Sequence, residues 1–133
     1  MKNILLIAGT AVLVSGCSFA ARSPEMYRDD TKAVLDTKSN DIRACYDGVL
    51  KATPGAAGKV TVKFDVETEQ GKIVNVAVDK PNTTAPDAVA DCVTKSINGL
   101  GITPPDKRVG QATFVWEFSA PAPGVYASPA PKS

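Results

Sequence analysis

Residues 58–79 read GKVTVKFDVETEQGKIVNVAVD, and their pattern is the strongest indication of the fold. Apolar and polar residues alternate strictly from 59 to 67, and a second alternation, through Val74, Val76 and Val78, runs from 72 to 79. Alternation with a period of two is typical of a strand with one buried face. The Glu-Gln-Gly between the two runs supplies a tight turn, because its glycine tolerates a positive φ. The stretch therefore predicts a β-hairpin.

Helical patterns flank this hairpin on both sides. Apolar residues recur mostly three, four or seven positions apart between 29 and 52, and again between 84 and 98, which indicates helices with one buried face. Ser39 and Asn40 could divide the first helix in two. Thr-Pro-Gly directly after the first pattern and Gly99 after the second are helix-ending signals.

A third strand is predicted at 110–119, where aromatic and polar residues alternate. The order of elements is then α-β-β-α-β. Placing the third strand beside the first gives a fully antiparallel three-stranded sheet in the order 3-1-2, with both helices on its apolar face. The predicted class is α+β, with the second and third strands at the edges. The opposite face of the sheet is expected to be exposed to solvent, with Thr61, Lys63, Asp65, Asn75, Thr113 and Glu117.

The N-terminus has the pattern of a bacterial lipoprotein signal. An apolar run from 4 to 14 has the length of a signal sequence and is too short to span a bilayer. It ends in Val-Ser-Gly-Cys at 14–17, which resembles a lipobox. We expect removal of residues 1–16 and acylation of Cys17 with chains such as palmitate, which would make it a stable membrane anchor. An ordinary secretory signal and an uncleaved anchor are the alternatives.

The charge balance and the composition of the chain ends indicate the class of partner and the limits of the folded domain. The 133 residues include 15 basic and 14 acidic side chains, so no basic excess favours a nucleic-acid partner. The expected organisation is a lipidated tether over 17–28, a folded domain over 29–119 and a disordered Pro/Ala-rich tail over 120–133. Ser18 is not the acidic residue that often marks inner-membrane retention, so the periplasmic face of the outer membrane is the expected location.

Once Cys17 carries lipid, Cys45 and Cys92 remain as a pair in an oxidising compartment. Each lies on the apolar stripe of a predicted helix, so a bond can form if the helices pack side by side with Cα atoms within about 7 Å. Closing the loop of residues 46–91 would stabilise the fold by about 4 kcal/mol. A redox-active pair and two free thiols are the alternatives. A zinc site would need more ligands than two cysteines in a chain without histidine.

Residues 29–118 contain, in this order, five short motifs: IRACYD at 42–47, GKV at 58–60, GKIV at 71–74, ADCV at 90–93 and a Pro pair at 104–105. With the aromatic last strand, they resemble the AgmX/PglI C-terminal domain family, which has a TonB-like fold. The Cys-Tyr of the first helix and the Cys of the second are the most specific element. The segment 100–105 departs from the family, in which a tryptophan and a Phe-Pro-x-Pro segment are expected there.

The resemblance implies a helix–helix disulfide and a periplasmic protein-interaction module, in a family linked to envelope machinery and gliding motility. A lipid anchor replaces the inner-membrane helix and long proline-rich spacer of TonB, so we expect a tethered adaptor rather than an energy transducer. An edge strand, 72–79 or 111–117, would pair with an extended segment of an envelope protein. Charges such as Lys72 and Lys80 favour the alternative of a protected edge. The candidate partner-binding residues are Lys72, Val74, Val76, Val78, Thr113, Val115 and Glu117.

Two other function classes compete with a protein adaptor. A structural lipoprotein that binds cell-wall glycan is the first, and its candidate polar residues are Asp65, Asp79, Asn82, Asp87 and Asp91. An enzyme is not expected, because the sequence has no histidine, no Gly-x-Ser-x-Gly and no carboxylates paired by spacing. The sequence predicts no catalytic residue, cofactor, metal or small-molecule substrate.

Overall fold

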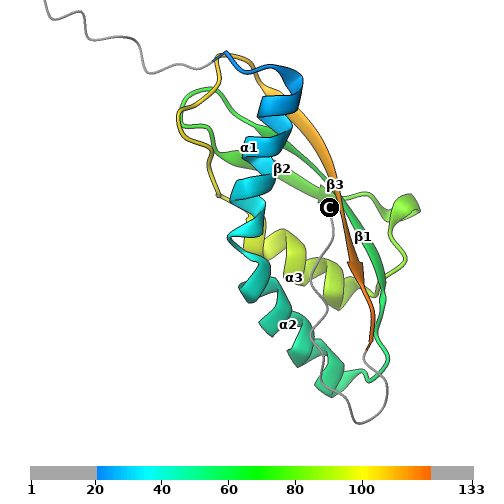
Figure 1. The fold of residues 1–133 in the computed structure, drawn as a ribbon. Helices are drawn as coiled ribbons and strands as arrows, with labels where there is room; N and C mark the ends of the chain where they lie inside the picture. The colour runs from blue at the N-terminus through cyan, green and yellow to red at the C-terminus, as the bar shows by residue number, and fades with distance from the viewer. Residues whose placement is uncertain (1–20, 121–133) are drawn as a thin grey trace, which may run out of the picture.

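The computed structural model describes residues 21–120. Its elements are, in order, α1 (Pro24–Asp36), α2 (Ser39–Ala52), β1 (Gly58–Val66), β2 (Ile73–Val78), the short 3-10 helix η1 (Lys80–Asn82), α3 (Asp87–Ile97) and β3 (Gly110–Phe118). The strands form one antiparallel sheet in the order β2-β1-β3, and the three α-helices lie on one side of it (Figure 1). The predicted α+β class and strand order are confirmed.

The helical pattern over 29–52, which Ser39 and Asn40 could divide, forms two helices, and the first begins earlier than expected. The Ser23 hydroxyl caps α1 by accepting the Met26 N–H, and a proline occupies the first helical position. Thr37 is the C-cap of α1, and its hydroxyl donates to the Val34 carbonyl at 2.6 Å. Residues 22–28, expected in the tether, therefore belong to the folded domain.

The core forms between the helices and one face of the sheet. The inward side chains of β1, from Val60 to Val66, are all buried, and β3 faces them in unbroken register from Gly58 opposite Phe118 to Val66 opposite Gly110. Aromatic rings fill the space under α2, where the ring centroids of Tyr46 and Phe118 are 4.8 Å apart. Each such buried apolar side chain contributes about 1.5 to 3 kcal/mol.

Strand β2 departs from the predicted alternation because it contains a bulge. Lys63 lies opposite Ala77, but Asp65 lies opposite Val74, one residue out of register. The extra residue in β2 lets Asn75 adopt a φ of 54°, and its side-chain amide donates to Asp65 at 3.0 Å. The inserted residue reverses which face of the sheet the earlier side chains of β2 point to. Ile73 therefore faces the core in place of Val74.

The expected exposure of Thr61 on the outer face is wrong. The Thr61 side chain is only 4% exposed, because the segment around η1 continues along β1 where β2 ends. The Thr61 hydroxyl donates to the Asn82 carbonyl at 2.7 Å, and the Thr61 N–H donates to the Thr83 hydroxyl at 3.0 Å. The other outward residues predicted there are exposed or half-buried.

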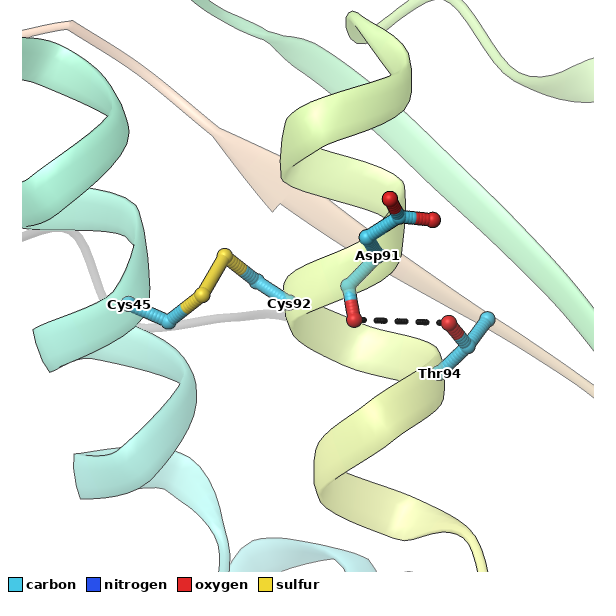
Figure 2. The surroundings of a disulfide bond; sticks show 4 residues. All are labelled: Cys45, Asp91, Cys92 and Thr94. Carbon is cyan, nitrogen blue, oxygen red and sulfur yellow. Dashed lines mark hydrogen bonds between the residues drawn. A yellow bond between two sulfur atoms is a disulfide. The ribbon is translucent and has the colours of Figure 1, made fainter. Parts of the chain in front are cut away.

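The predicted disulfide is present and joins α2 to α3 (Figure 2). The Cα atoms of Cys45 and Cys92 are 5.6 Å apart. Cys92 is buried, whereas Cys45 is exposed. The bond therefore attaches α2, the outer of the two helices along this side, to a helix that packs on both β1 and β2.

Candidate functional site

Strand β3 has one unpaired edge within residues 21–120, because only β1 pairs with it. Thr61 uses both its N–H and its C=O on the β2 side of β1. In an antiparallel ladder the backbone groups of successive residues point to opposite sides of the strand. Val60 and Val62, on either side of Thr61, therefore direct their N–H and C=O groups toward β3 and bond the residues opposite them, Trp116 and Phe114. The alternate residues of β3 consequently direct their N–H and C=O groups away from the sheet: Gln111, Thr113, Val115 and Glu117.

The β2 edge is largely occupied by the chain itself. The Ile73 N–H donates to the Leu100 carbonyl at 2.6 Å, and its C=O accepts the Gly99 N–H at 3.2 Å. The Ile102 N–H donates to the Gly71 carbonyl at 2.9 Å, so Lys72 and Gly101 lie opposite each other in an antiparallel bridge. What remains is the short piece beyond the bulge at Asn75, and short, bulged edges resist strand addition.

These two edges divide the predicted partner-binding residues. Lys72, Val74, Val76 and Val78 lie along or beside the β2 edge, which the chain occupies up to the bulge, while Thr113, Val115 and Glu117 lie on the open β3 edge. Strand β1 separates the two sets, so they do not form one surface. The geometry favours β3 as the edge available to a partner.

A groove of about 400 Å³ lies between α1 and the first half of β3. Tyr27 and Thr31, one turn apart on α1, form one wall, and Ala112 and Phe114 of β3 form the other. Thr31 is buried, and its hydroxyl is satisfied by the Tyr27 carbonyl at 2.7 Å, so the wall is largely apolar. The groove opens beside the unpaired edge of β3.

Gly110 allows α1 to approach β3 this closely. A Cβ atom at Gly110 would lie 2.6 Å from the nearest ring carbon of Tyr27. The Tyr27 hydroxyl donates to the Arg108 carbonyl at 3.2 Å, and burial together with the charge of Asp106 raises the pKa of this phenol. Tyr27 therefore stays protonated as a hydrogen-bond donor at neutral pH.

A polar cluster centred on the buried side chains of Arg22 and Asp106, the Arg22 clasp, fixes the N-terminal end of the domain to the segment before β3. It consists of Arg22, Asp30, Pro104, Asp106 and Arg108. The Arg22 N–H donates to the Asp106 carboxylate at 2.8 Å, and its guanidinium donates to Asp30 at 2.6 Å and to the Pro104 carbonyl at 2.7 Å. Arg108 completes the cluster by donating to the Arg22 carbonyl. In Figure 1 the blue start of α1 and the gold segment before β3 meet at this end of the molecule.

Asp106 remains ionised in this cluster although it is completely buried. Burial by itself raises the pKa of its carboxyl, but hydrogen bonds from the Arg22 and Arg108 N–H groups and the Arg108 guanidinium outweigh burial and lower the pKa below its usual value. The carboxylate thus holds Arg22 beside Asp106, 84 positions later in the chain.

The residues considered for glycan binding do not converge. Asp65 bonds Asn75, and Asp79 bonds Asn82 at 2.9 Å and Lys63 at 3.2 Å, while the other two acids lie on α3. Among residues 21–120 no group of acidic or cysteine side chains is placed to hold a metal ion. In the same range, no helix is long and apolar enough to cross a bilayer.

The sequence prediction missed both the groove and the Arg22 clasp, because it assigned their N-terminal residues to a tether. The helical spacing of Tyr27, Thr31 and Leu35 was the available signal. The predicted lipidation site, Cys17, and the Pro/Ala-rich tail lie outside the described residues.

Comparison of the chain with protein-family models, curated proteins and solved structures finds no match. The resemblance to the AgmX/PglI family therefore rests on the motifs alone.

Proposed function

We propose that the chain is a lipid-anchored envelope lipoprotein that faces the periplasm and acts as a non-enzymatic protein-interaction module. Its β3 edge would accept an extended segment of an envelope protein as a fourth strand. The observation that carries this proposal is the row of outward backbone groups on β3 beside an apolar groove. In strand addition, main-chain hydrogen bonds supply affinity and pockets for alternate side chains supply specificity.

The domain would lie a short distance from the proposed anchor, because the Arg22 clasp makes Arg22 part of the fold. Arg22 follows Cys17 by five positions, so the chain between their Cα atoms spans at most about 18 Å. A TonB-like transducer has to reach across the periplasm, whereas this domain would be held beside the membrane that carries its lipid. We therefore propose an adaptor within an envelope-spanning or motility machine, on the periplasmic face of the outer membrane.

Lipidation is tested by replacing Cys17 with serine. The wild-type chain should fractionate with membranes and incorporate labelled palmitate, and the C17S variant should do neither. A wild-type chain that is released with the soluble periplasmic fraction would contradict the anchor.

Partner binding is tested by affinity purification of the full-length chain from detergent-solubilised envelopes, with Thr113→Pro as the diagnostic variant. Proline removes the N–H that points away from the sheet and leaves the bonds between β3 and β1 intact. The control is Lys51→Glu, an exposed change on α2. We expect one envelope protein to copurify with the wild type and the control and to be lost with Thr113→Pro. Retention on purified peptidoglycan, equal in all three chains, would instead favour the glycan-binding alternative.

A further inference from the structure

The groove lies on the helix side of the open β3 edge, where α1 passes over the first half of β3 (Figure 1). A strand added to β3 sends every second side chain toward the helices, next to Ala112 and Phe114. One of these side chains would enter the groove, in contact with Tyr27 and Phe114. An apolar side chain fits this lining, because the one hydroxyl on the α1 wall, that of Thr31, already donates to the Tyr27 carbonyl.

The rim of the groove is positive. Two arginines, Arg28 and Arg108, border it, and none of the residues that line it is acidic. Arg108 already bonds Asp106 and the Arg22 carbonyl. Arg28 is 68% exposed, and its ion pair with the equally exposed Asp29 is a weak contact at 3.5 Å. The Arg28 guanidinium is therefore available to a carboxylate on a bound strand.

Two occupants from the protein itself fit this surface less well. A second copy could pair its own β3 edge with this one, but its helix-side residues, such as Phe114 and Trp116, are buried in its own core. They could not enter the groove. The chain's own residues 121–133 contain four prolines, which lack the N–H that edge pairing requires, and no acidic side chain to meet Arg28.

We propose, as an extension of the function proposed above, that this site selects an extended segment of another envelope protein with one apolar and one acidic side chain two residues apart. Both side chains would lie on the helix side of the added strand. The apolar one fills the groove between Tyr27 and Phe114, and the carboxylate pairs with Arg28. The backbone of the segment bonds the outward groups of Gln111 and Thr113.

A displayed library of random peptides, selected on the full-length chain in detergent micelles, is the probe. We expect enriched peptides to share an acidic residue two positions from an apolar one. Changing that acid to its amide should weaken binding about two- to five-fold in fluorescence anisotropy, as for an exposed ion pair. Arg28→Glu should weaken binding at least as much, and a peptide with lysine in place of its acid should regain affinity for that variant. Lys51→Glu should leave binding unchanged.

The outcomes separate this inference from the proposed function. Enriched peptides that lose binding with Thr113→Pro but show no acidic preference overturn the charge rule and leave strand addition intact. A failure to enrich any peptide, or binding that Thr113→Pro does not affect, overturns both. Dimerisation of the chain abolished by Thr113→Pro, or enrichment of sequences like residues 121–133, overturns the inference in favour of a second copy or the chain's own tail.

Discussion

At the scale of single residues, Asp106 holds together parts of the chain that are far apart in sequence. Its carboxylate accepts the N–H groups of Arg22 and Arg108 while it is fully buried. A buried charge costs free energy unless complementary groups surround it, so every member of this cluster depends on the others. The positions of Arg22 and of the segment before β3 depend on this one side chain.

Replacing Asp106 with alanine should leave the backbone N–H groups of Arg22 and Arg108 without their acceptor and remove the buried charge that lies 3.8 Å from the Arg22 guanidinium. We expect the free energy of unfolding to fall by about 3 to 5 kcal/mol, measured by urea denaturation with circular dichroism. Asp36→Ala is the matched control, because its carboxylate pairs with exposed Lys32 within α1 and should cost less than about 0.5 kcal/mol. Equal losses in the two variants would refute the structural role of the Arg22 clasp.

The same carboxylate predicts how stability depends on pH. The pKa of Asp106 is lower in the folded state than in the unfolded state, so the unfolded state takes up its proton first on acidification. Its contribution to stability is complete above about pH 4, the usual range for an unfolded aspartate, and is lost as the pH falls through the folded-state pKa. Melting temperatures measured from pH 7 to pH 2 should fall more steeply for the wild type than for Asp106→Asn. Parallel curves would contradict this assignment.

At the scale of elements, the disulfide determines how firmly α2 is attached. Replacing both Cys45 and Cys92 with serine removes the closure of residues 46–91 from the unfolded chain and should lower the free energy of unfolding by about 4 kcal/mol. Denaturation of the double variant, compared with the oxidised wild type, measures this. A difference below about 1 kcal/mol would mean that packing of α2 on α3 holds the helix without the bond.

Proline substitutions along β3 should report which backbone groups face outward. Ala112 lies opposite Phe64 and bonds β1, so Ala112→Pro should cost about 1 to 3 kcal/mol by leaving a buried carbonyl unpaired. The N–H of Thr113 faces away from the sheet, so Thr113→Pro should change stability by less than about 1 kcal/mol. Thermal denaturation of the two variants is the measurement. If Thr113→Pro were the more destabilising change, the outward N–H and C=O groups of β3 would belong to Ala112 and its alternate residues instead.

Elements with a clear local period could be predicted from the sequence, whereas tertiary contacts could not. The hairpin, α3, β3 and the helix–helix disulfide follow from alternation, helical spacing and the count of cysteines. The bulge at Asn75 was hidden, because Val74, Val76 and Val78 read as one regular face although Asn75 reverses it. The occupied β2 edge also depends on the segment after α3 folding back against Ile73, which no local pattern encodes.

At the scale of the whole molecule, three features meet at one end of the domain: the Arg22 clasp, the groove and the start of β3. The proposed lipid on Cys17 would enter at this same end, five residues before Arg22. A partner segment that binds the groove would therefore be captured close to the membrane. This arrangement suits an adaptor that receives a segment from a neighbouring envelope protein and does not suit a transducer that spans the periplasm.

Site-specific photo-crosslinking in living cells tests strand addition at β3 most directly. A photoreactive amino acid is placed at Thr113 on the open edge, and at Lys51 on α2 and Ala77 on β2 as controls. We expect an adduct with one envelope protein from Thr113 alone, lost when proline replaces the neighbouring edge residue Val115. Adducts of equal yield from all three positions, or no adduct from Thr113 in cells that yield one from Ala77, would contradict it.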